Sequence, residues 1–72
     1  MDKLQIIDGY MKFMWNRFDQ FVCERLFGAR ADHIFRKWID CRESAGVEGA
    51  PAMFWASVSN DVKEAILSEI DK

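Results

Sequence analysis

The side chains best suited to chemistry in this 72-residue chain are its only histidine, His33, and two cysteines, Cys23 and Cys41. No His, Cys, Asp or Glu recurs around His33 at the spacing of metal ligands, and neither cysteine belongs to a C-x-x-C pair. A general base also needs a positioned partner. We therefore interpret His33 as a surface residue and both cysteines as small core residues. We expect a non-enzymatic protein with no metal or other cofactor.

A second candidate for chemistry is the G-x-x-G match at 46–49, a spacing that some RNA-binding loops use to clamp the nucleic-acid backbone. Glu48 places a negative charge in the middle of this match, and the flanking sequence shows no strand-like alternation. The segment is therefore interpreted as a connection of small residues. The sequence also contains no G-x-S-x-G, phosphate-binding loop or dinucleotide fingerprint.

The strongest pattern in the chain is an apolar stripe in its first third, with members alternately three and four residues apart. Its members are Leu4, Ile7, Met11, Met14, Phe18 and Phe21. This spacing places apolar side chains on one face of a helix, so it predicts a long helix over 4–27. Gly28 should end that helix, because glycine readily adopts the left-handed conformation at a helix C-terminus.

The remainder of the chain also has helical patterns. Asp32 is predicted to cap a helix over 32–44, with Gly46 as its stop. A loop of small residues over 45–50 should lead to Pro51, which suits the first position of a short helix.

Asp61 and Glu64 resemble a capping box at the start of the last helix. The sequence therefore predicts an all-α fold in one domain, residues 1–72. We expect a small bundle of three to four helices, with a long N-terminal helix packed against shorter ones.

The length of the first helix suggests how the protein functions. The helix over 32–44 is about half as long as the one over 4–27, so a hairpin of the two leaves the N-terminal half of the stripe uncovered. Either the C-terminal helices or a second copy must cover it. We expect a protein–protein interaction module, an adaptor, regulator or inhibitor, that forms a homodimer through the first helix. The predicted interface residues are Leu4, Ile7, Met11, Met14, Phe18, Phe54 and Trp55.

A basic segment supports an alternative function. If the first two helices formed a helix-turn-helix, the second would present basic side chains to nucleic acid. The face would comprise Arg30, His33, Arg36, Lys37 and Arg42. The net charge of −2 and the lack of Asn, Gln or Ser among these residues argue against base reading.

Charged residues interrupt the apolar N-terminal segment before a signal peptide or membrane span could form. Asp2, Lys3 and Asp8 are the first of these charges. We therefore expect a cytoplasmic protein that does not act on membranes. No small-molecule substrate is indicated.

Overall fold

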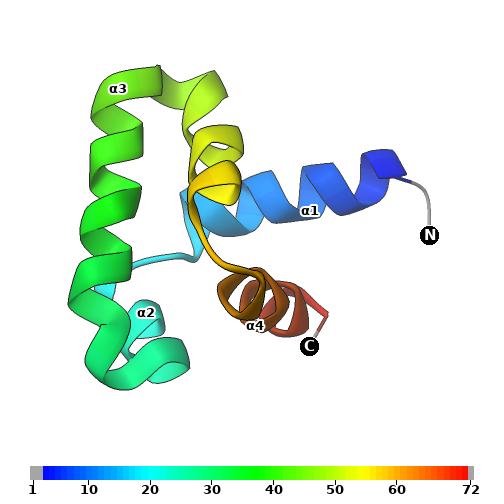
Figure 1. The fold of residues 1–72 in the computed structure, drawn as a ribbon. Coiled ribbons are helices and arrows are strands. Elements are labelled where there is room, and N and C mark those ends of the chain that lie inside the picture. Colours follow the sequence, from blue (N-terminus) through cyan, green and yellow to red (C-terminus); the bar gives the residue numbers. More distant parts are fainter. Residues whose placement is uncertain (1–2, 72) are drawn as a thin grey trace.

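A computed structural model describes residues 3–71 of the chain, with side chains from residue 8 onward. The described residues form helices and no strand, as the all-α prediction requires (Figure 1). The elements are α1 (Lys3–Asn16), α2 (Gln20–Phe27), the short 3-10 helix η1 (Gly28–Arg30), α3 (Ala31–Ser57) and α4 (Asn60–Ile70).

The predicted helix over 4–27 is interrupted after Asn16. The backbone N–H groups of Arg17 and Phe18 both donate to the carbonyl of Phe13, at 2.9 and 2.8 Å, which closes α1 with a wide final turn. Asp19 then takes an extended conformation, and its Oδ1 accepts a hydrogen bond of 2.8 Å from the Val22 N–H. Asp19 is therefore the N-cap of a new helix, because its carboxylate satisfies a backbone donor that the helix itself leaves unpaired.

The predicted stop at Gly28 is confirmed, since α2 ends there and Gly28 has a φ of +59°. The predicted cap at Asp32 is wrong. η1 leads directly into α3, so the N-cap position is Arg30, which makes no side-chain capping hydrogen bond. Asp32 instead lies in the first turn of α3, where a carboxylate still interacts favourably with the helix dipole.

Helix α3 is kinked at Gly46, whose φ of +73° and ψ of −168° are not helical. The predicted stop is thus correctly placed, and the kink divides α3 into a first half (31–45) and a second half (47–57) that turns back beside it (Figure 1). The expected loop over 45–50 is wrong, because the helix resumes directly after Gly46. Pro51 consequently lies inside the second half and not at its first position.

Helix α4 begins before the predicted capping pair. Its N-cap is Ser59, whose hydroxyl donates a hydrogen bond to Oδ1 of Asp61. Arg30 Nη2 lies 2.7 Å from the other carboxylate oxygen of Asp61. The Ser59 hydroxyl, followed by Arg30, holds the pKa of Asp61 below its usual value. The pair at 30 and 61 connects the start of α3 to the start of α4.

Aromatic rings form the centre of the core. Phe18 is 6% exposed and lies with its ring centroid 5.8 to 6.3 Å from those of Phe13, Phe35, Trp38 and Phe54. The turn after α1 therefore directs Phe18 inward, between helices that are distant in sequence.

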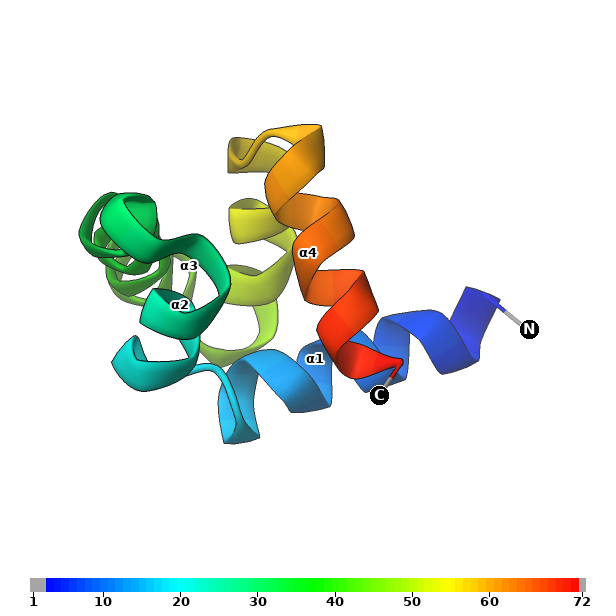
Figure 2. The ribbon, with the colours of Figure 1, turned by 90° about the horizontal axis from the view of Figure 1, so that it is seen from below.

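Figure 2 shows α4 crossing α1, and the amino-terminal end of α1 extending beyond this crossing. Contact at the crossing is close: a Cβ added to Gly9 would lie 3.7 Å from Cγ2 of Ile70. Among the described residues, no helix is both long enough and apolar enough to cross a membrane.

Candidate binding groove

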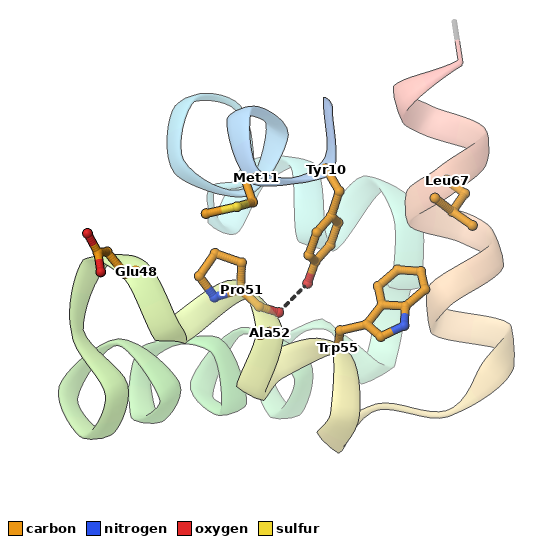
Figure 3. Close-up of a pocket in the computed structure, with 7 residues that line it drawn as sticks. All are labelled: Tyr10, Met11, Glu48, Pro51, Ala52, Trp55 and Leu67. Atoms are coloured by element: carbon orange, nitrogen blue, oxygen red, sulfur yellow. Dashed lines mark hydrogen bonds between the residues drawn. The ribbon is translucent and has the colours of Figure 1, made fainter. Parts of the chain in front are cut away.

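An apolar groove lies between α1, the second half of α3 and α4 (Figure 3). Its volume is about 380 Å³. The lining residues are Tyr10 and Met11 from α1, Glu48, Pro51, Ala52 and Trp55 from α3, and Leu67 from α4. We call this the α1–α3–α4 groove. It is assembled from three segments of the chain, so its shape depends on how the helices pack.

Tyr10 connects two walls of the groove. Its hydroxyl donates a hydrogen bond of 2.7 Å to the backbone carbonyl of Pro51, and its ring meets Trp55 edge-on with centroids 4.9 Å apart. Burial raises the pKa of the Tyr10 hydroxyl well above its ordinary value, so the group stays neutral. Because this hydroxyl already has an acceptor, the groove wall at this point offers a ligand apolar surface.

Charges of opposite sign border the groove. Glu48 lies at one end of the lining, away from Trp55 (Figure 3). At Trp55, the ammonium of Lys63 lies 5.5 Å from the centre of the indole, close enough for a cation–π interaction. A partner lying in the groove would thus meet an apolar floor between an acidic and a basic residue.

The structure divides the predicted interface residues into three groups. Met11 and Trp55 are half-buried and line the groove. Met14, Phe18 and Phe54 differ from the expected interface role in being buried within the single chain, where they belong to the core and do not line the groove. The side chains of Leu4 and Ile7 lie outside the described residues.

Five groove residues are absent from the interface predicted from the sequence: Tyr10, Glu48, Pro51, Ala52 and Leu67. Tyr10 lies off the apolar stripe of the first predicted helix, and Leu67 belongs to no pattern singled out in the sequence. The sequence predicts a helix start at Pro51, and Glu48 enters the analysis only as the acidic residue within the G-x-x-G match. No local pattern marks any of them as groove residues, because they become neighbours only when three helices pack.

The basic residues of the alternative nucleic-acid face line different hollows, and several of them already have partners within the chain. Arg30 and His33 line a hollow with Lys37, but Arg30 pairs with Asp61 and Lys37 donates to the Ser57 carbonyl at 3.1 Å.

The other two basic residues lie elsewhere on α3. Arg36 lines a separate hollow with Asp32, Asp40 and Glu43, and the guanidinium of Arg42 lies 5.4 Å from the ring centre of Trp15. Interspersed carboxylates weaken the attraction for phosphate, which depends on concentrated positive charge.

Other groups capable of chemistry are dispersed or buried. Cys23 and Cys41 are both buried free thiols. Within the part of the chain that the structure describes, no three His, Cys, Asp or Glu side chains converge on a metal-sized site. The indole N–H of Trp15 is buried without an acceptor, and it is the one such side-chain group among the described residues.

No family model matches this chain, and comparisons with curated proteins and with solved structures found no significant similarity.

Proposed function

We propose that this protein is a non-enzymatic protein–protein interaction module, an adaptor, regulator or inhibitor, that receives an apolar helix of its partner in the α1–α3–α4 groove. The observation that carries this proposal is the lining: apolar side chains from three helices surround the groove, and Tyr10 already uses its hydroxyl within the chain. Grooves of this kind bind amphipathic helices through apolar side chains at helical spacing.

The lining favours a helix over a small molecule. Small-ligand sites combine an apolar pocket with a few polar groups that converge on the ligand and fix its orientation. Among the described residues that line the groove, Glu48 alone is charged, and it lies at an end of the groove. Trp55 is of the residue type that most often dominates binding energy at protein interfaces.

A display library of amphipathic helical peptides tests the proposal, because it samples many apolar helices at once. We expect the protein to enrich peptides with apolar residues at positions i, i+3, i+4 and i+7. Ala52→Arg places a long charged side chain in the groove and should reduce binding of the enriched peptides at least tenfold. Ala29→Arg is the matched control, because Ala29 is an exposed residue of η1 and does not line the groove.

Fluorescence anisotropy of labelled peptides would measure these affinities, and circular dichroism would confirm that both variants keep the wild-type helix content. The proposal fails if no peptide of this pattern is enriched. It also fails if Ala52→Arg and Ala29→Arg bind the enriched peptides equally well.

A further inference from the structure

Helix α1, which supplies Tyr10 and Met11 to the groove, also carries an exposed pair of opposite charges. From the core outward, α1 presents the buried Tyr10, the half-buried Met11, and then Asp8 and Lys12. Lys12 Nζ lies 3.0 Å from Oδ2 of Asp8, and these side chains are 70% and 65% exposed. A helix lying over Met11 would therefore have the groove on one side and these two charges on the other.

Helix α1 also continues past the groove. Its amino-terminal end extends beyond the crossing with α4 (Figures 1 and 2). In the sequence, Leu4 and Ile7 precede Met11 by seven and four residues, spacings that place all three positions on one face of a helix. Helix α1 therefore supplies one wall of the groove. Its amino-terminal part also has the apolar spacing of a helix that such a groove could bind.

We propose that the occupant of the α1–α3–α4 groove is a second copy of this chain, through an antiparallel pairing of the two α1 helices. This inference rests on the proposed function of the groove. A two-fold axis that passes the outer face of α1 at the level of residue 10 places Asp8 of each copy opposite Lys12 of the partner subunit. The same contact brings the amino-terminal half of each α1 towards the groove of the other copy, so one symmetric interface fills both grooves.

The charges select the antiparallel arrangement. In a parallel pairing of α1 helices in register, Asp8 would face Asp8 of the partner subunit, and the two Lys12 side chains would also face each other. The antiparallel pairing replaces both repulsions with attractions. It also aligns the positive end of each helix dipole with the negative end of the other.

Charge reversal tests this pairing directly. Asp8→Lys alone places two lysines of each copy opposite two lysines of the other, and Lys12→Asp alone does the same with aspartates. We expect each variant to dimerise about tenfold more weakly than wild type, as two unfavourable surface contacts of about 0.5–1 kcal/mol each would produce. The two variants mixed in equal amounts should form a heterodimer preferentially, because every opposing pair is then of opposite sign.

Light scattering coupled to size exclusion would measure the homodimers from about 1 µM to about 1 mM, a range that spans weak to moderate affinity. Native mass spectrometry of the mixture would quantify the heterodimer. Ala52→Arg should weaken the dimer at least tenfold and Ala29→Arg should leave it unchanged. Groove-binding peptides from the display library should dissociate the wild-type dimer.

Three results would overturn the inference. The first is a wild-type chain that stays monomeric throughout this range, and the second is a dimer unaffected by Ala52→Arg. The third is a mixture of the charge variants that shows no excess of heterodimer. Each leaves the proposed function intact if library peptides still bind the groove, whereas failure of the peptide experiment counts against the groove itself.

Discussion

Phe18 and Phe21 belong to the same apolar stripe in the sequence, yet the structure predicts very different effects when each is replaced by alanine. Phe18 is 6% exposed and is surrounded by four aromatic rings, whereas Phe21 is 72% exposed. Removing a buried phenylalanine costs about 3–5 kcal/mol through lost burial and the cavity that remains. We expect Phe18→Ala to fall in this range, and Phe21→Ala to change stability by no more than about 0.5 kcal/mol.

The size of the protein sets the scale of this effect. At roughly 0.05–0.15 kcal/mol per residue, a chain of 72 residues is stable by about 4–11 kcal/mol. Phe18→Ala would therefore remove a large part of the total and could leave the chain unfolded. Phe18→Leu keeps most of the buried volume and should cost less than about 1.5 kcal/mol, so it gives a measurable folded variant.

Urea denaturation followed by circular dichroism would measure the free energy of unfolding of all three variants and wild type. The measurement should be made at a low concentration, where any dimer dissociates, so that only the stability of the single chain is compared. Equal losses for Phe18→Ala and Phe21→Ala would refute the reasoning. Such a result would mean that both phenylalanines share one environment, as they would on an uninterrupted helix over 4–27.

Three further predictions concern the kink, the link between α1 and α3, and a buried thiol. Gly46→Ala should destabilise the protein by about 1–3 kcal/mol in thermal unfolding, because the φ of +73° strains any residue with a Cβ. Gly9→Ala is the contrasting variant, because Gly9 lies within helix α1 and a Cβ there would meet its neighbour at ordinary contact distance. It should stabilise the protein by up to about 1 kcal/mol. Tyr10→Phe should cost about 0.5–1.5 kcal/mol in urea denaturation, because it removes the buried hydrogen bond that joins α1 to the Pro51 carbonyl of α3; an unchanged midpoint would contradict this link. Burial, with the nearby charges of acidic side chains, raises the pKa of Cys23 from 9.0 to about 11. As the pH rises, the unfolded chain therefore loses this thiol proton before the folded chain does. The contribution of Cys23 to the free energy of unfolding is thus fully present below pH 9. It falls by up to about 1.4 kcal/mol per pH unit as the pH rises towards 11. Urea titrations between these pH values should show a shallower decline in Cys23→Ala than in wild type.

The sequence alone predicted the helical class and several boundaries, because these depend on local physical chemistry. The apolar spacing of three and four is a property of one helix. Gly28 and Gly46 were identified as stops because glycine adopts positive φ at little cost, and both have positive φ in the structure. The break at Asp19 was also within reach of sequence reasoning, since aspartate is a strong N-cap residue. The apolar stripe continues across that position, and its spacing therefore predicted one uninterrupted helix.

The candidate site was far less predictable, since only Met11 and Trp55 of its residues were identified from the sequence. The neighbours at 53–55 show why. Met53 is 41% exposed, Phe54 is fully buried and Trp55 borders the groove, although all three are large apolar residues in consecutive positions.

A spacing pattern determines which side chains share a helical face, and this was enough to predict an all-α protein. Whether that face meets the core, a groove or solvent depends on the direction in which each helix leaves its turn and on which helices then pack against it. Those directions depend on the turn after α1 and on the kink at Gly46, which folds α3 back on itself. α4 then crosses α1. Burial is a property of the assembled helices, and therefore only the tertiary structure could separate the core residues from those of the groove.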